Sequence, residues 1–352
     1  MPPRPDLRSV LHRCAGTAAF DAAVRVADRV LPGRRGLLTV LTYHRVDEPD
    51  RHPELFPGLV SATPDEFDAQ LGLVAAQSNV VSLAELIEVR EGRADLPPRA
   101  VLLTFDDAYA DFADVAWPLL RRHGLPATLF VPTAYPDAPA RAFWWDRLHE
   151  ALQRATAPAV VTPVGRLPLE GGTDRAAAYR ALRTFLKSRP HEEAMGVVDG
   201  LVEELQAPPG RSPVLGWDRL RALAADGVAL APHSRTHPLL TRVGRDRLVD
   251  EVQGSLADLH REVGPTPSVF AYPGGGIDDA VAGSLADAGY RLAFTTERGN
   301  EPLDRSGRGP DWLRLRRVNV GRRTTPALLR AQLLPVALPP RRRRAVPAAR
   351  TS

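Results

Sequence analysis

The sequence has almost no cysteine: Cys14 is the only one among 352 residues. A single cysteine excludes an internal disulfide framework and a metal site built from several thiolates. The chain also has no apolar run near the ~18 residues of a membrane-spanning helix. Charged residues interrupt residues 7–30, so this stretch lacks the apolar segment of a signal peptide. We therefore expect a protein of the cytoplasm, or one peripheral to the inner membrane.

Lysine and net charge are also scarce. Lys187 is the only lysine, and 46 basic residues against 42 acidic residues leave a net charge of +4. So small an excess does not indicate a nucleic-acid partner, and we expect none. The C-terminal region is rich in proline and arginine, with four arginines in a row at residues 341–344, which is typical of a solvated tail. A weak contact of the basic termini with an anionic membrane surface is the alternative for these segments.

The composition is otherwise that of an ordinary globular protein, with 44% hydrophobic and 25% charged residues. The length exceeds that of a usual single domain, although α/β barrels reach about 250 residues. We expect an N-terminal helical extension over residues 1–36, a globular core over 37–320 and a basic Pro/Arg-rich tail over 321–352. Within the core, residues 134–213 show helical patterns but few strand signals, so we interpret them as a mostly helical insertion.

Strand and helix patterns alternate between the two ends of the chain. Thr63 and Glu66 have the spacing of a capping box, with Pro64 at the first helical position, and Ser82 and Glu85 repeat that spacing. Repeated β-then-α units predict a parallel sheet with helices outside, and about seven units favour a barrel over an open sheet. The predicted strands span residues 37–43, 100–105, 127–131, 228–231, 268–272, 291–295 and 313–320. The main predicted helices of the core span residues 111–122, 217–225, 246–263 and 279–288.

Residues with catalytic potential follow four of these strands. In barrels and open parallel sheets alike, active sites form at the carboxyl ends of the strands. We therefore expect the residues after the strands to converge on one rim. They are His44 after the first strand, Asp106 and Asp107 after the second, His233 and His237 after the fourth, and a Pro-Gly-Gly-Gly loop from Pro273 after the fifth.

These residue types predict a hydrolytic metal site. Two imidazoles and one carboxylate form a common catalytic zinc set that leaves a position for water. His233 and His237 could supply the imidazoles, although a bare His-x-x-x-His pair is more often a pair of surface histidines. Of Asp106 and Asp107, one could bind metal while the other stays free as a base; the alternative is that the pair only caps a helix. His44 on its own is more often structural at a strand end.

Three motifs carry a resemblance to a known family. They are Thr104-Phe105-Asp106-Asp107, His233-Ser234-Arg235-Thr236-His237-Pro238 and Phe270-Ala271-Tyr272-Pro273-Gly274-Gly275. Their sequence and order resemble the first three motifs of the polysaccharide deacetylase family, the carbohydrate esterases with a NodB-type domain. By motif placement the resemblance covers roughly residues 37–320. It implies a distorted (β/α) barrel of about seven parallel strands, and hydrolysis of an N-acetyl, or sometimes O-acetyl, group on a glycan.

The resemblance also implies a role for each matching residue. Asp107, His233 and His237 would bind a divalent metal ion, with zinc as the expected ion. Asp106 would be the general base. A glycan or another N-acetylated sugar would be the partner in the reaction.

The third motif departs from the family's pattern at one position. Tyr272 and Pro273 would line the substrate groove, and the backbone N–H of Gly274 would help to hold the oxyanion. Ala271, however, stands where the family usually carries an arginine that orients the base. A milder departure is Ala108, where the family usually has glycine after the two aspartates.

Two roles must therefore be filled from elsewhere in the chain. Arg316 and Arg317 are candidate substitutes for the orienting arginine. The C-terminal Leu-x-x-His motif that usually supplies the general acid is absent from the sequence. Family members that deacetylate poly-N-acetylglucosamine supply this histidine from the first strand, in a Tyr-His sequence that Tyr43-His44 resembles. His44 is therefore the candidate acid.

Three other functions stay open on the sequence alone. A carbohydrate-binding protein on the same scaffold, without turnover, is favoured by Ala271. A hydrolase of a small N-acyl compound would have a closed pocket rather than a long cleft. A membrane-peripheral assembly protein would act through its basic ends. Trp144 and Trp145 could stack on sugar rings, but paired tryptophans are more often packing anchors. Tyr109 is a groove candidate with the same alternative.

Overall fold

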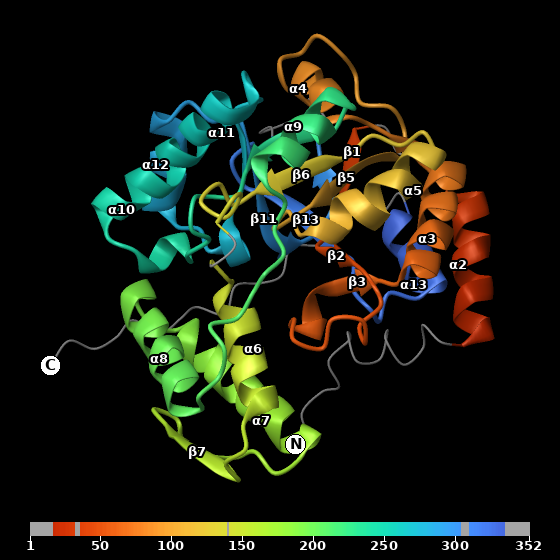
Figure 1. The fold of residues 1–352 in the computed structure, drawn as a ribbon. Helices are drawn as coiled ribbons and strands as arrows, with labels where there is room; N and C mark the ends of the chain where they lie inside the picture. The colour runs from red at the N-terminus through yellow and green to blue at the C-terminus, as the bar shows by residue number, and fades with distance from the viewer. Residues whose placement is uncertain (1–16, 32–35, 139–140, 304–309, 335–352) are drawn as a thin grey trace, which may run out of the picture.

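Seven parallel strands form a nearly closed barrel in the computed structural model, which describes residues 17–31, 36–138, 141–303 and 310–334 (Figure 1). The strands are β1 (Leu37–Tyr43), β5 (Ala100–Phe105), β6 (Thr128–Val131), β9 (Ala229–Pro232), β10 (Val269–Ala271), β11 (Leu292–Arg298) and β13 (Leu315–Asn319). Their order around the barrel is β10-β11-β13-β1-β5-β6-β9, and all hydrogen-bonded neighbours on this path are parallel. The predicted parallel barrel is confirmed.

The barrel is open between β9 and β10. No ladder of hydrogen bonds pairs these two strands in the described part of the chain, although they lie in contact. His233, directly after β9, donates from Nδ1 to the carbonyl oxygen of Ala271 at the end of β10, over 2.7 Å. One polar side chain therefore bridges the seam at the carboxyl ends of the strands.

Side-chain alternation along the strands separates two cores. Leu38 and Val40 of β1 pack with Phe130 and Phe294 from other strands inside the barrel, where the two phenylalanine rings lie 5.7 Å apart. Leu41, on the opposite face of β1, packs with the helices outside. Because both faces are buried, these strands have nearly continuous apolar sequences rather than alternating ones.

Helices cover the outside of the barrel (Figure 1). The predicted capping boxes are confirmed: Thr63 with Glu66, and Ser82 with Glu85, each exchange side-chain and backbone hydrogen bonds at a helix start. The helices are α3 (Pro64–Gln77), α4 (Leu83–Arg90), α5 (Trp117–Arg122), α9 (Trp217–Ala225), α10 (Arg245–Val249), α11 (Ser255–Val263) and α12 (Asp279–Asp287). Short strands β2 (Arg45–Val46), β3 (Val60–Ala62), β4 (Asn79–Val80) and β12 (Glu301–Pro302) complete the core, with 3-10 turns η1 (Pro57–Leu59), η3 (Leu240–Arg242) and η5 (Pro273–Gly275).

Two helices that the sequence predicts as continuous contain a π-helical turn. The turn η2 (Phe112–Ala116) precedes α5, and η4 (Asp250–Gly254) lies between α10 and α11. Such turns occur often at functional sites because the extra residue changes where side chains point. Carboxylates at both turns bind nearby loops: Asp111 accepts from the Val46 amide over 2.6 Å, and Glu251 binds the loop after β9. Each π turn therefore lies at a carboxylate that binds a neighbouring loop.

The segment after β6 forms a lobe beside the barrel, built from residues 134–213 (Figure 1). It contains α6 (Trp144–Arg154), α7 (Gly172–Leu186), α8 (His191–Glu204) and a hairpin of β7 (Ala159–Thr162) and β8 (Gly165–Pro168). Phe143, Leu182 and Val198 belong to the lobe's own apolar cluster. The hairpin was not predicted, because β8 contains no buried residue and therefore no apolar pattern.

Two terminal helices pack together against the barrel's outer layer (Figure 1). They are α2 (Ala18–Val30) and α13 (Pro326–Leu333). Helix α13 lies in the segment predicted as a basic tail; it forms because Leu329 and Leu333, four residues apart, are buried in the core around α3. The arginine run at 341–344, and residues 1–16 with Cys14, lie outside the described residues. None of the helices in the described ranges has the length and apolar character needed to cross a membrane.

Candidate active site

The carboxyl ends of the strands open into a cavity of about 350 Å³. Its lining includes all five of the polar residues that follow strands in the sequence: His44, Asp106, Asp107, His233 and His237. Parallel strands bring residues far apart in the chain to one end of the barrel, so positions 44 to 237 share one cavity.

Asp107, His233 and His237 form a group that fits a divalent metal ion. One ligand atom from each lies within 4.8 Å of the others. Asp107 Oδ1 is 3.2 Å from His237 Nε2 and 3.6 Å from His233 Nε2. The same oxygen is buried and has no hydrogen-bond partner among the described residues. A buried carboxylate oxygen without a partner is unfavourable, whereas a bound cation would satisfy it.

His233 is held in the form that binds metals. Its Nδ1–H donates to the carbonyl oxygen of Ala271, which leaves the Nε2 lone pair directed at Asp107. Burial of the side chain lowers the pKa of His233 to about 4. The imidazole is therefore neutral at pH 7, as a metal ligand must be.

The backbone at this group is strained. Asp107 and Ala108 have φ angles of 73° and 52°, and Ser234 and His237 have φ angles of 61° and 58°. Residues other than glycine rarely adopt this left-handed conformation, and those that do are concentrated at functional sites. The resemblance leads us to expect glycine at position 108, and Ala108 adopts this conformation at a steric cost that glycine would not have.

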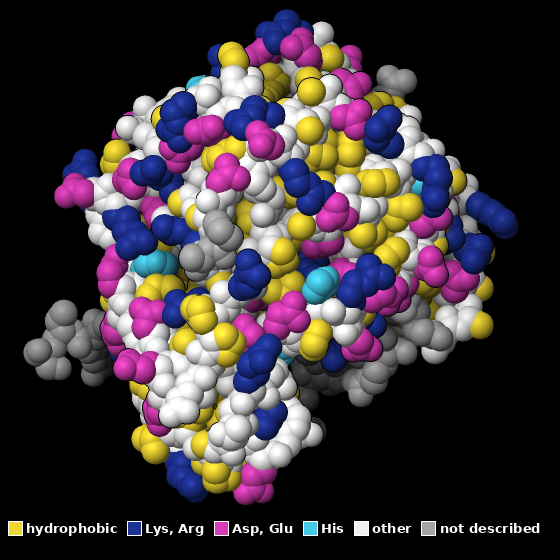
Figure 2. Space-filling model, in the orientation of Figure 1, with side chains coloured by type: hydrophobic (Ala, Val, Ile, Leu, Met, Phe, Trp, Pro, Cys, Tyr) yellow, Lys and Arg dark blue, Asp and Glu magenta, His cyan; other side chains and the backbone are white. Residues whose placement is uncertain are grey.

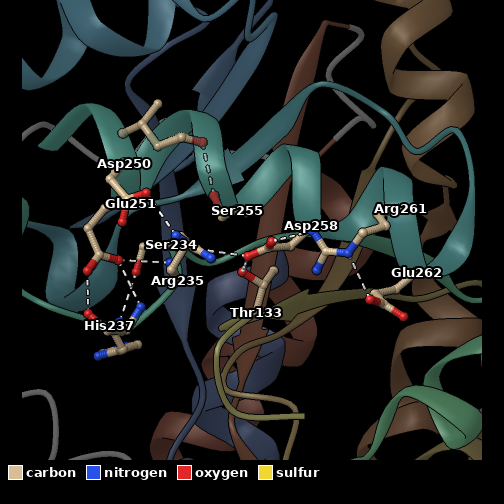
Figure 3. Close-up of polar contacts among 12 residues, drawn as sticks. Thr133, Ser234, Arg235, His237, Asp250, Glu251, Ser255, Asp258, Arg261 and Glu262 are labelled. Carbon is tan, nitrogen blue, oxygen red and sulfur yellow. Dashed lines mark hydrogen bonds and ion pairs between the residues drawn. The ribbon is translucent and has the colours of Figure 1, made fainter. Parts of the chain in front are cut away.

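A buried carboxylate fixes the loop that carries His237 (Figure 3). Glu251 Oε2 accepts from the backbone amides of Arg235 and Thr236, over 2.9 and 2.8 Å. A second carboxylate, Asp258, accepts from Arg235 Nε and Thr133 Oγ1 over 2.9 and 2.8 Å. The sequence reasoning did not single out either residue. Their only signal is that they lie seven residues apart on one helical face, which is common for acidic residues.

Asp106 is paired with Arg317 rather than with the three metal-binding candidates. The two guanidinium nitrogens of Arg317 donate to the two carboxylate oxygens, each over 2.8 Å, and both side chains are almost fully buried. Burial alone would raise the pKa of Asp106, but the charge of Arg317 reverses this and holds the pKa well below its usual range. Asp106 is therefore an ionised carboxylate, 3.9 Å from His233 Nε2.

Strand alternation decides which of the two candidate arginines reaches Asp106. Arg317 shares a face of β13 with Leu315, which packs inside the barrel. Arg316 is on the opposite face, where its Nε donates to Glu301 over 2.7 Å. An arginine therefore pairs with Asp106 although position 271 carries alanine.

The remaining candidates divide between the cavity and the core. His44 lines the cavity, and its backbone amide donates to Ser61 Oγ over 3.0 Å. Gly274 also lines the cavity and has a φ of 59°. Tyr272 and Pro273 are absent from the lining: Tyr272 is fully buried, and its hydroxyl donates to Leu313 O over 2.9 Å. The side chain of Tyr272 therefore supports the loop instead of facing the groove.

The aromatic residues of the insertion serve mainly in packing. Trp145 is buried and donates from Nε1 to the Tyr109 hydroxyl over 3.0 Å, and that hydroxyl donates to Asp146 over 2.6 Å. The Trp145 ring also contacts the edge of His237, with ring centroids 4.8 Å apart. Trp144 is half-buried and lines the cavity. Tyr109 and Trp145 thus join the lobe to the site.

The fold and the site together define a class of protein. It is a parallel α/β barrel that carries an Asp-His-His group and an aspartate paired with an arginine at the carboxyl ends of its strands. The chain belongs to the polysaccharide deacetylase family, whose model matches residues 93–293. A relative, the poly-β-1,6-N-acetyl-D-glucosamine N-deacetylase of Staphylococcus epidermidis, is 32% identical over 123 residues. That match covers 32% of this chain and 42% of the relative, so it spans less than half of the relative's length.

Solved structures share the fold. The Streptococcus pyogenes deacetylase PplD, in complex with acetate, is 19% identical with a TM-score of 0.56, over 85% of this chain and 99% of that one. IcaB from Ammonifex degensii is 20% identical with a TM-score of 0.53, over 85% of this chain and 97% of that one. The de-N-acetylase from Aggregatibacter actinomycetemcomitans is 17% identical with a TM-score of 0.55, over 84% and 99%.

Proposed function

We propose that this protein is a metal-dependent hydrolase that removes N-acetyl groups from a glycan. The observation that carries the proposal is that one cavity contains two aspartates in different surroundings. Asp107 lies with His233 and His237 and has an oxygen without a partner, while Asp106 is kept ionised and separate by Arg317. Family membership and the similarity to a named N-deacetylase support the same reaction.

A metal ion fits the first group. Two imidazoles and a carboxylate suit Zn²⁺, which when bound would polarise the acyl carbonyl and lower the pKa of water. The protein's own contribution is to present three ligand atoms at one point. It does so through a fixed His233 tautomer and a loop held by Glu251.

The other residues of the cavity would transfer protons and stabilise the developing negative charge. Asp106 would accept a proton from the attacking water, since its carboxylate is ionised and fixed by Arg317. The backbone N–H of Gly274 would donate to the oxyanion of the tetrahedral intermediate. His44, which lines the same cavity from the neighbouring strand β1, would donate a proton to the departing amine. Acetate and a free amino sugar would be the products.

The pairing of Asp106 with Arg317 favours turnover over a purely sugar-binding function. Ala271 was the feature that favoured a binding protein without activity, because it removes the arginine expected beside the base. Arg317 supplies a guanidinium to that carboxylate from a different strand. The base therefore keeps an ionic partner despite the altered motif.

The experiment is acetate release from N-acetylglucosamine oligomers by the wild type and by Asp106→Asn. General base groups typically contribute about 10²–10⁴-fold to the rate, so we expect a loss of that order. The metal content should be unchanged, because Asp106 lies outside the ligand group. Full activity of Asp106→Asn would remove it from the mechanism.

A further inference from the structure

The cavity extends from the hydrolytic site to a positively charged wall. This wall is formed by the end of α7, the start of α8 and the turn η3. Its basic residues are Arg183, Lys187, Arg189 and Arg242. Among the described residues, the lining contains no carboxylate other than the two aspartates of the hydrolytic site.

Three of these basic side chains have no ion-pair partner within the described ranges: Arg183, Lys187 and Arg242. The fourth, Arg189, lies 3.7 Å from Glu193. Other arginines pair with carboxylates, as Arg219 does with Asp114 and Arg247 with Glu192, and Figure 2 shows basic and acidic side chains interspersed over the face in view.

The lack of an ion-pair partner is least favourable for Lys187. It is half-buried, and burial together with the charge of Arg183 lowers the pKa of Lys187 to about 8. The ammonium group is therefore still mostly protonated at pH 7, although the attraction of Asp107 does not offset its burial and the charge of Arg183. Desolvated charge without a partner is unfavourable, so a ligand that supplies the anion would be bound preferentially.

The dipole of helix α7 explains only part of the basic cluster. Arg183 and Lys187 lie at the C-terminal end of α7, where the helix dipole favours cations. Arg242, however, belongs to η3, which follows the His237 loop on the barrel. The cluster thus combines residues from the insertion and from the barrel that line one cavity.

We propose that Arg183, Lys187 and Arg242 form a subsite for an anionic group on the glycan, so that the substrate is an acidic glycan rather than a neutral one. The inference rests on the proposed function, because it takes the sugar at Asp106 to be part of the same substrate. The group is an oxyanion, a phosphate or a carboxylate, since guanidinium and ammonium groups bind both through charge-assisted hydrogen bonds. The insertion would then select the substrate while the barrel performs the hydrolysis.

The test compares three probes: a neutral N-acetylglucosamine tetramer, the same tetramer with a phosphate at its reducing end, and one with a carboxylate there. For the wild type we expect kcat/KM for the better anionic probe to exceed that for the neutral probe by about 10-fold. The preference should shrink at high salt, because screening weakens the attraction. The ranking of the two anionic probes identifies which oxyanion the subsite takes.

Variants assign the preference to the cluster. Arg183→Gln and Lys187→Gln should each reduce the ratio of anionic to neutral kcat/KM by about 3- to 10-fold. Arg180→Gln is the matched control: Arg180 is exposed on the same helix, α7, but does not line the cavity. It should leave the ratio unchanged. An equal effect of Arg180→Gln would overturn the subsite in favour of general electrostatic attraction.

A binding measurement separates this proposal from the proposed function. Calorimetry with the full-length protein gives Kd for the neutral, phosphorylated and carboxylated tetramers without need of turnover. Tighter binding of the phosphorylated tetramer that Arg183→Gln abolishes would support the subsite, even if no probe releases acetate and the proposed function fails. Equal kcat/KM and equal Kd for all three probes would overturn the subsite and leave the hydrolysis intact.

Discussion

Replacing Arg317 by glutamine tests the ion pair that holds Asp106, the proposed base. Its two hydrogen bonds to Asp106 are 2.8 Å long, and the side chains are only 2% and 3% exposed. Breaking a buried pair by removing one partner costs about 3–5 kcal/mol, because the other charge stays buried without compensation. We expect Arg317→Gln to lower the free energy of unfolding by this amount.

A double-mutant cycle separates the interaction energy of the ion pair from the packing that each substitution removes. Asp106→Asn/Arg317→Gln removes both charges, so it should be more stable than Arg317→Gln alone, with a coupling energy of about 2 kcal/mol or more. Urea unfolding followed by circular dichroism measures all four proteins, with Arg316→Gln as the control. Arg316 pairs with Glu301 on the other face of β13, where the side chains are 14% and 10% exposed, so its loss should cost less than the loss of Arg317.

Activity provides the second measurement in the same series. Arg317→Gln should reduce kcat for acetate release by about 10²–10⁴-fold, since the base loses the charge that keeps it ionised. Arg316→Gln should stay active. If the cycle is additive, or if Arg317→Gln unfolds no more easily than Arg316→Gln, the pair does not stabilise the site and the reasoning is refuted.

Three further changes test other parts of the account. Glu251→Gln should weaken metal affinity about 10- to 100-fold, because it loosens the loop of His237; unchanged affinity in a metal titration would contradict this. His44→Ala should reduce kcat about 10²–10⁴-fold with metal content unchanged, and full kcat would exclude it as the acid. Burial, opposed by hydrogen bonds such as that from Tyr109, raises the pKa of Asp146 to about 6. Because that value exceeds the ~3.9 of the unfolded chain, the wild type should lose up to about 3 kcal/mol of stability relative to Asp146→Asn as the pH rises from about 4 to about 6. Equal pH slopes in urea unfolding would show that Asp146 does not titrate there.

The strands were predictable where both of their faces are buried. The predicted bounds 37–43 and 100–105 match β1 and β5, because a strand in the middle of the barrel is apolar throughout and ends where polar site residues begin. The exposed hairpin β7–β8 has no such signal. Helix α13 was interpreted as part of a tail, since its apolar pattern is only two turns long and is followed by arginines.

The sequence predicted only those site residues that follow strands. His44, Asp106 and His233 could be placed together because parallel strands end on one side of a barrel. For the arginine beside Asp106, the sequence offered Arg316 and Arg317 but could not decide between them, because the two adjacent residues differ only in which face of β13 they occupy. The support from Glu251 depends on a π turn that local sequence does not specify.

The central claim is that a metal ion at Asp107, His233 and His237 is needed for hydrolysis. The direct measurement is acetate release from N-acetylglucosamine oligomers by protein stripped with a chelator, before and after addition of Zn²⁺, with metal content determined in parallel. We predict that activity is lost on stripping and returns as about one ion per chain binds, and that Asp107→Ala neither retains the ion nor recovers. Full acetate release by metal-free protein would contradict the account.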